Sequence, residues 1–263
     1  METIKFYTSY KEINIMSLPI KYYTTKTQLL CVHCLMDLKN YFQNKEIITI
    51  LNKHNVSISE SILSRYINGK MLPSFQKSMD ILYALYNENI LRKILERKLV
   101  IDRQGIVNIT YIAFDIPILR LAACYAWIRF KDNNIDHVLT AAVNGIPLST
   151  LIAELLDSQL AAAKNNLDAG ISRYLEAKYY VPNPPRYQSL YLPYYELKPN
   201  SNILIVDDLL FSGRTLGALI ELAQKSKSKI IGVFSLVAVG ETWKRYITDL
   251  KETDIFIIKR IEE

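Results

Sequence analysis

The sequence contains few cysteines, and no segment of it is suited to span a membrane. Its 263 residues include only three cysteines, too few for the disulfide framework of small secreted domains. No apolar run is long enough to cross a bilayer and no signal peptide starts the chain, so we expect a cytoplasmic protein without a membrane partner. The length and the apolar fraction of 50% favour one large or two small globular domains.

Two of the cysteines have the spacing of a metal knuckle, in Cys31-Val32-His33-Cys34. A tetrahedral zinc site needs a second pair of Cys or His ligands, and no such pair completes this one. The neighbouring leucines repeat with helical spacing, so burial in a helix is the favoured interpretation. A local redox role and adventitious metal binding are the alternatives.

The excess positive charge lies in the first part of the chain. Residues 1–100 contain 14 Lys and Arg against 8 Asp and Glu, whereas residues 101–263 contain 18 of each sign. Such an asymmetry is expected when one domain binds nucleic acid and the other does not, although a basic solvated surface would look the same. We therefore predict two domains, residues 1–100 and residues 101–263.

The basic domain shows a series of helical patterns. We expect helices over 26–43, 45–53, 59–68 and about 75–99, the last linking the two domains. Ser57 and Glu60 have the spacing of a capping box for the third helix, and Gly69 suits its end. A short helix, a turn and a helix with small polar residues on one face describe a helix-turn-helix.

The run from Ser64-Arg65-Tyr66-Ile67-Asn68 to Pro73-Ser74 resembles the recognition helix and exit turn of repressor-type DNA-binding domains. The resemblance implies that double-stranded DNA is a partner, with the third helix in the major groove. The implied DNA contacts are Ser59, Glu60, Ser61, Ser64, Arg65, Asn68, Lys70 and Ser74. A small helical dimerisation module is the alternative.

The most informative segment lies in the second domain. Residues 203–206 are apolar and mostly β-branched, as in a buried parallel strand. Asp207 and Asp208 follow, where strands of open α/β sheets end and ligands bind. The turn Ser212-Gly213-Arg214-Thr215 then presents backbone N–H groups and hydroxyls at the start of a helix, which suits an anion. Together these features predict a pocket for a sugar that carries a phosphate.

This segment resembles the 5-phosphoribosyl-1-pyrophosphate (PRPP) motif of type I phosphoribosyltransferases. The resemblance implies an α/β fold, a parallel sheet with flanking helices, here preceded by the all-α helix-turn-helix domain. It implies that Asp207 and Asp208 hold the ribose 2′ and 3′ hydroxyls, with Mg²⁺ bridging the hydroxyls and pyrophosphate without a direct protein ligand. The implied cradle of the 5′-phosphate is Phe211, Ser212, Gly213, Arg214 and Thr215. Two residues depart from the family: Phe211 stands where some purine enzymes have a carboxylate, and Arg214 where Gly or Lys is usual.

An upstream segment points to the same family. A predicted strand over 137–143 leads into Asn144, Gly145 and Ile146, followed by a helix over 150–156, and this resembles the pyrophosphate loop of orotate-type phosphoribosyltransferases. Between the motifs the family has a flexible hood loop that closes over PRPP. Lys164 matches its basic residue, with Ala163 where a neighbouring Arg is usual, and a plain surface loop is the alternative.

Seven tyrosines between 174 and 195 could stack on a base or a partner, with compositional bias or an ordinary aromatic interface as the favoured explanation.

These features favour a transcription regulator. Its phosphoribosyltransferase-like domain would bind PRPP or a related nucleotide and form a homodimer, as in phosphoribosyltransferase-like regulators, including archaeal proteins with an N-terminal helix-turn-helix. The alternative is an active phosphoribosyltransferase with an appended DNA-binding domain. The altered hood loop and the lack of a recognisable base-binding motif argue against it. A scaffold with a degenerate pocket is a third and weaker hypothesis.

Overall fold

The computed structural model describes residues 20–102, 107–248, 250–251 and 254–262. The chain folds into two compact units, Met1–Asn89 and Ile90–Glu263. Within the described ranges, no helix combines the length and the apolar character needed to cross a membrane. Each unit buries its own apolar residues and is described by itself.

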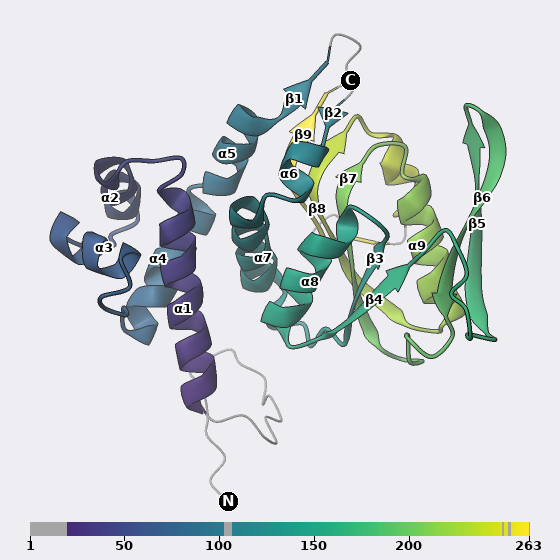
Figure 1. Cartoon of the computed structure of the whole chain (residues 1–263), viewed down its shortest axis with the longest axis horizontal. Coiled ribbons are helices and arrows are strands. Elements are labelled where there is room, and N and C mark those ends of the chain that lie inside the picture. Colours follow the sequence, from purple (N-terminus) through teal and green to yellow (C-terminus); the bar gives the residue numbers. More distant parts are fainter. Residues whose placement is uncertain (1–19, 103–106, 249, 252–253, 263) are drawn as a thin grey trace, which may run out of the picture. The chain divides into compact units, whose positions relative to one another are not determined.

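The first unit is helical throughout its described part (Figure 1). Its helices are α1 (Ile20–Leu38), α2 (Asn44–Lys53), α3 (Glu60–Ile67) and α4 (Phe75–Asn87). α1 packs against α3 and α4, and α2 packs against the same two helices. Leu35, Leu51 and Leu63 are fully buried where these helices meet. This arrangement is consistent with the helix-turn-helix that the sequence predicts.

α3 begins at a different cap from the one predicted. Ser59, not Ser57, occupies the N-cap, and its side-chain oxygen accepts a hydrogen bond from the Ile62 amide at 3.3 Å. Ser59 has the extended backbone that an N-cap requires, with φ −76° and ψ 157°. The predicted capping box of Ser57 and Glu60 is therefore wrong, because the chain is still in the turn at Ser57.

The long helix predicted over 75–99 is in fact two helices. α4 ends at Asn87, α5 spans Ile90–Lys98, and Asn89 between them has a left-handed backbone with φ 54°. Asn enters this region more readily than most residues, because its short polar side chain can bond locally. The two units divide between Asn89 and Ile90. α5 therefore belongs to the second unit, and the division precedes the predicted boundary at residue 100.

The cysteines of α1 lie in the core of the first unit. Cys31 and Cys34 are free thiols with 0% exposure. Burial raises the pKa of the Cys31 thiol, and the neighbouring Cys34 adds to the shift. Such a thiol stays protonated and packs as a small apolar group. In the part of the chain that the structure describes, no group of His, Cys, Asp and Glu could hold a metal ion. These observations support the structural interpretation of both cysteines.

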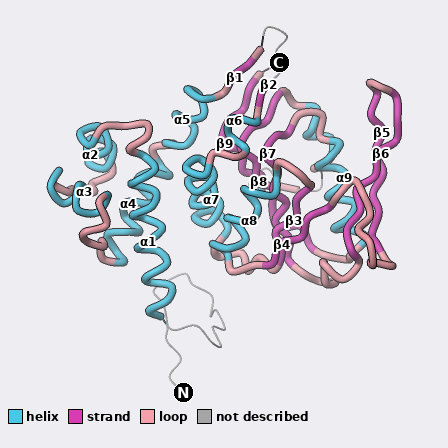
Figure 2. The backbone as a smooth tube through the Cα atoms, in the orientation of Figure 1, coloured by secondary structure: helices cyan, strands magenta, loops and turns pink. Residues whose placement is uncertain are grey.

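The second unit contains a five-stranded parallel sheet with helices against it (Figures 1 and 2). The strand order is β4-β3-β7-β8-β9, and every neighbouring pair is parallel. The strands are β3 (His137–Ala141), β4 (Gln159–Ala163), β7 (Asn202–Leu210), β8 (Lys229–Val239) and β9 (Ile255–Ile261). The predicted α/β fold with a parallel sheet is confirmed, and β7 is its central strand.

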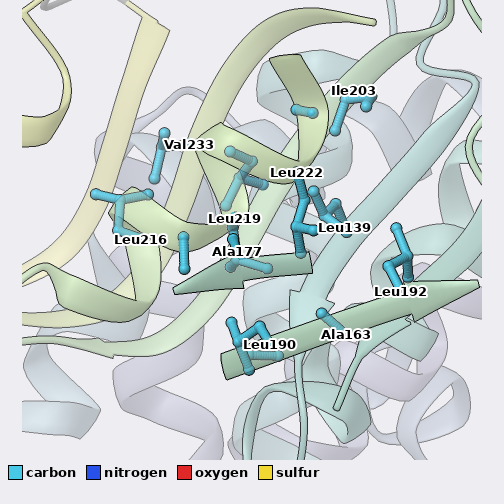
Figure 3. Packing of buried hydrophobic residues seen from close by; sticks show 14 of the residues in the cluster. Leu139, Ala163, Ala177, Leu190, Leu192, Ile203, Leu216, Leu219, Leu222 and Val233 are labelled. Carbon is cyan, nitrogen blue, oxygen red and sulfur yellow. The ribbon is translucent and has the colours of Figure 1, made fainter. Parts of the chain in front are cut away.

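Helices and short elements complete the second unit. They are β1 (Val100–Ile101), β2 (Val107–Asn108), α6 (Thr110–Ala113), α7 (Ile116–Phe130), α8 (Gly145–Leu156), α9 (Arg214–Lys225) and the 3₁₀ helix η1 (Thr242–Tyr246). α8 packs against α7, β3 and β7, whereas α9 packs against β3, β7 and β8. Leu216, Leu219 and Leu222 of α9 share one buried cluster with Leu139 and Ile203 of the sheet (Figure 3). This packing fixes α9 at the carboxyl end of β7.

The Tyr- and Pro-rich segment is an antiparallel hairpin, not the loop that the sequence predicts. Its strands are β5 (Tyr174–Pro182) and β6 (Pro185–Pro193), paired along their whole length. Ala177, Leu190 and Leu192 of the hairpin are buried and belong to the same cluster as α9 (Figure 3). The end of the hairpin far from its turn, residues 174–177 and 190–193, is therefore part of the core. Every second side chain there meets α9 or the sheet.

Candidate functional site

The acidic pair predicted from the sequence lies on the central strand. β7 continues through Asp207 and Asp208 as far as Leu210, because its last residues still pair with β8. Both aspartates are 7% exposed. The backbone N–H of Asp208 donates a hydrogen bond to Oδ1 of Asp207 at 3.1 Å. The two carboxylates are therefore close together and shielded from water.

Burial and mutual repulsion act on the protonation of this pair. Burial raises the pKa of Asp207 well above its usual range, and the charge of Asp208 adds to the increase. Burial also raises the pKa of Asp208, although hydrogen bonds, including one to the Asn144 side chain, partly oppose the shift. Two adjacent carboxylates without a cation resist full ionisation. Oxygen donors of this kind suit Mg²⁺ and sugar hydroxyls, which would relieve that repulsion.

The segment after β3 approaches the same carboxylates. α8 begins at Gly145, so Gly145 and Ile146 form its first turn and not a loop, which corrects the predicted helix start at residue 150. Pro147 does not prevent this start, because a first turn needs no backbone donor there. A Cβ at Gly145 would lie 2.2 Å from the Thr140 hydroxyl oxygen and 3.7 Å from Oδ1 of Asp207. Glycine therefore permits the close approach of α8 to the acidic pair.

The predicted phosphate cradle forms a small cavity where β7 passes into α9. Asp207 and residues 209–216 line a cavity of about 100 Å³. Gly213 is the N-cap of α9 with φ 75°, in the left-handed region. The first backbone N–H groups of a helix have no intrahelical acceptor, so those of α9 can donate to an anion in this cavity. Ser212 and Thr215 add hydroxyls, whereas the Phe211 ring is 56% exposed.

Two side chains that sequence reasoning missed hold this cavity in shape. Trp243 and Tyr246 of η1 pack against the start of α9, where a Cβ at Gly213 would lie 2.5 Å from the Trp243 Cα atom. A Cβ at Gly217 would lie 2.4 Å from the Tyr246 ring. The two glycines, four residues apart, were the only signal in the sequence, since such spacing lets a bulky group approach one helix face.

We predict that Gly213→Ala disables the cavity. The left-handed backbone costs an alanine about 1–2 kcal/mol, and the added Cβ also forces the η1 backbone away. We expect the affinity for PRPP to fall by about tenfold, which isothermal titration calorimetry would measure. Gly170→Ala is the matched control, because Gly170 has φ 83° with nothing within 4 Å of an added Cβ. Equal affinity in the two variants would contradict the role of Gly213.

Lys164, the predicted hood residue, does not join the acidic pair in the structure. Its ammonium binds both carboxylate oxygens of Asp168, at 3.1 Å and 3.0 Å. The bond to Asp168 raises the pKa of Lys164. The backbone of Lys164 pairs with Tyr191 of the hairpin. Lys164 therefore joins β4 to β6, and its role in binding pyrophosphate stays a prediction.

The residues predicted to contact DNA lie on and beside α3. Arg65 and Asn68 are exposed and stand four and seven positions after the exposed Ser61, so all three share one helix face. Leu63 and Tyr66 bury the opposite face. The remaining predicted contacts are exposed or half-buried: Ser59, Glu60, Ser64, Lys70 and Ser74. The structure thus presents a polar, solvent-facing helix face after a turn, as a recognition helix requires.

Some of these residues also have structural roles. Ser59 and Ser74 are the N-caps of α3 and α4, and the Asn68 amide donates to the Ser64 carbonyl oxygen at 2.8 Å. A substitution at one of these positions would therefore also destabilise a helix end. Arg65 is the clearest candidate for a base contact, because no described residue pairs with its guanidinium.

Comparisons with known proteins identify similar chains. A family model described as "Phosphoribosyl transferase domain" matches residues 116–261. The "Probable purine biosynthesis transcriptional regulator PurR" of Streptococcus pneumoniae is 30% identical over 105 residues, which are 40% of this chain and 38% of that protein. A "Xanthine phosphoribosyltransferase" of Alkaliphilus metalliredigens is 25% identical over 127 residues, 48% of this chain and 63% of that enzyme. The alignments thus span less than two thirds of either relative.

A solved structure is similar to most of the second unit. The adenine phosphoribosyltransferase of Rhodothermus marinus superposes with a TM-score of 0.55 and 19% identity, covering 65% of this chain and 99% of that one. At this identity the similarity shows the fold alone. The narrower resemblances to orotate-type enzymes and to archaeal regulators stay predictions.

Proposed function

This chain belongs to the phosphoribosyl transferase domain family, as its two motifs predicted, and from that membership we propose that it is a DNA-binding transcription regulator whose effector is PRPP or a related nucleotide. The observation that carries the proposal is the buried pair of Asp207 and Asp208 beside the cavity at the start of α9. A chain that used this domain only as a scaffold would have no need to keep two repelling carboxylates buried.

The residues of the pocket have distinct roles in this proposal. Asp207 and Asp208 accept hydrogen bonds from the 2′ and 3′ hydroxyls of the ribose. Ser212, Thr215 and the first N–H groups of α9 bind the 5′-phosphate. Asn144 and Gly145 bring the start of α8 close enough for the pyrophosphate, where Mg²⁺ would supply countercharge through oxygen ligands. Phe211 and Arg214 set this pocket apart from the usual pattern of the family.

The first unit supports the DNA-binding part of the proposal. α3 presents an exposed face that includes Arg65. Residues 1–89 contain 10 Lys and Arg against 7 Asp and Glu, so the first unit carries half of the net charge of +6. The other half lies in the second unit, which includes the four basic residues of α5. Homodimerisation through the second unit would place two recognition helices one DNA turn apart, about 34–36 Å. The name of the streptococcal relative suggests purine biosynthesis as the regulated process.

An active phosphoribosyltransferase is the second candidate. The similarity to xanthine phosphoribosyltransferase and the complete acidic pair favour it. Displacement of pyrophosphate relies largely on positioning and charge, so a missing general base does not exclude it. The pairing of Lys164 with Asp168 and the exposed Phe211 in place of an acidic residue favour the regulator.

Fluorescence anisotropy of the full chain on DNA from its own promoter tests the proposal. At fixed salt, with Mg²⁺ throughout, we expect PRPP to change the affinity for DNA by about 5–150-fold, the usual range of coupling between sites. Ribose 5-phosphate without pyrophosphate is the matched control ligand. If PRPP leaves the DNA affinity unchanged and pyrophosphate is released when a purine base is added, the regulator proposal is wrong and the enzyme proposal is favoured.

A further inference from the structure

A second cavity of the second unit lies outside the pocket for PRPP. It occupies about 450 Å³ between the hairpin, α9 and η1. Three basic side chains line it, Lys178, Arg214 and Arg245, together with three aromatic rings, Tyr179, Tyr180 and Tyr246. We name it the basic cavity. Among the residues that the structure describes, no acidic side chain lines it.

The charges of the basic cavity are poorly compensated. Neither the Arg214 nor the Arg245 guanidinium has a carboxylate within ion-pair distance among the described residues. Arg245 instead lies over the Tyr246 ring, 4.9 Å from its centroid, and donates to the Tyr246 hydroxyl at 3.2 Å. Lys178 has an acidic neighbour in the described part of the chain, Glu176, with its ammonium 3.5 Å from the carboxylate. A concave surface with this charge attracts an anion.

The rings of the basic cavity favour an aromatic group on the same ligand. Tyr180 is 49% exposed, and its ring centroid lies 5.6 Å from that of Tyr187 in an edge-on arrangement. Tyr246 is fixed by its packing against α9 at Gly217. Rings of this kind stack on nucleobases, and Arg adds a cation–π contact. The volume lies in the range of small-molecule sites, roughly 300–1,000 Å³, and far exceeds the space that one phosphate needs.

From this geometry we propose that the basic cavity is a second ligand site, which binds a nucleotide with its phosphates on Arg214, Arg245 and Lys178 and its base on the tyrosine rings. The site is distinct from the PRPP pocket, because Asp207 and Ser212 line only the smaller cavity at the start of α9. A strand of nucleic acid is the weaker choice, since it needs a groove that follows its backbone and the cavity is a single hollow.

The two sites are linked through shared residues. Arg214 lines both cavities. Tyr179 lines the basic cavity and lies close enough to Thr215 of the phosphate cradle for that residue to lower the pKa of the Tyr179 hydroxyl, against the larger effect of burial. A nucleotide that holds Arg214 thereby changes the charge and the mobility of the cradle, so occupancy of one site alters the affinity of the other in both directions. The regulator would thus respond to two ligands and not to one.

Isothermal titration calorimetry of the full chain with ATP tests the site. We expect ATP affinity to fall by about tenfold in Arg245→Gln and in Tyr180→Ser, because each removes one recognition element from the cavity. Both positions lie at the surface of the hairpin or η1, and an unchanged melting temperature would show that the variants are folded. Lys229→Gln, which removes a positive charge at the start of β8, is the matched control.

Other results would overturn the proposal. If ATP affinity is unchanged in both variants, the basic cavity is excluded as the ATP site. Loss of ATP binding in Asp207→Asn would place ATP in the PRPP pocket. Inorganic tripolyphosphate that binds as tightly as ATP would exclude base recognition. Binding of a single-stranded oligothymidylate, lost in Arg245→Gln while ATP does not bind at all, would assign the surface to nucleic acid.

Discussion

Replacing the acidic pair by Asp207→Asn and Asp208→Asn should reduce the affinity for PRPP by at least about a hundredfold. Each ionised carboxylate that accepts a ligand hydroxyl contributes about 1.5–3 kcal/mol, so losing both exceeds the 2.7 kcal/mol that corresponds to a hundredfold change. Calorimetry with PRPP and Mg²⁺ measures the loss. DNA affinity in the absence of PRPP should not change, because the pair belongs to the second unit.

The same variant should be more stable than the parent. A carboxyl whose pKa is raised on folding stabilises the protein only in acid, and this contribution is lost as the pH rises through the raised pKa. At neutral pH the pair therefore costs stability, and the two amides should increase the free energy of unfolding by about 0.5–2 kcal/mol. Asp132→Asn, in the exposed turn before β3, is the control. A less stable variant, or one that still binds PRPP, would contradict this assignment.

The pH dependence of PRPP binding by the parent protein should follow from the same raised pKa values. The ribose hydroxyls would donate hydrogen bonds to ionised carboxylates, and burial raises the pKa values of Asp207 and Asp208. Affinity for PRPP should therefore weaken as the pH falls through a range that lies above the one in which a free aspartate becomes protonated. The Asn variant should lack this dependence.

Arg65→Ala should produce the largest loss of operator recognition among the residues of α3. A side chain that reads a base edge contributes about 1–3 kcal/mol, which is roughly a 5–150-fold change in affinity for the cognate site. Affinity for random DNA should change far less, and anisotropy on both kinds of DNA at one salt concentration separates the two. Arg92→Ala, which removes an exposed Arg paired with Glu96 on α5, is the matched control. Equal losses on both DNAs would reduce Arg65 to a phosphate contact.

The sequence predicted the centre of the second unit well because its chemistry is local. A buried strand, two carboxylates, a small-residue turn and an amphipathic helix follow one another within 202–225, so no distant contact decides their arrangement. The same holds for α2 and α3. The start of α9 was also expected, since Gly213 provides the left-handed residue that the turn needs.

The sequence-based predictions fail where contacts between segments far apart in the sequence determine the structure. The hairpin was expected to be a loop because the resembled family has a flexible hood loop in this region. Pro182 and Pro185 do not prevent the hairpin, because they flank its turn and need no ladder partner beyond it. In addition, the end of the hairpin next to its turn does not pack on a core that would require alternating buried and exposed residues. The break between α4 and α5 was missed because apolar spacing continues across Asn89. The packing of η1 against Gly213 joins segments that are far apart in the sequence, and the spacing of Gly213 and Gly217 is its only signal there.

The position of Trp243 gives the protein an optical probe of the proposed phosphate cradle. The indole is 1% exposed, donates to the Gly240 carbonyl oxygen at 2.9 Å and belongs to the segment that touches Gly213. The sequence contains two tryptophans, and the other, Trp127, lies on α7. A Trp127→Phe protein would carry a single tryptophan, beside the cradle. Selective excitation of this tryptophan would follow ligand binding without a dye, on the time scale of a stopped-flow experiment.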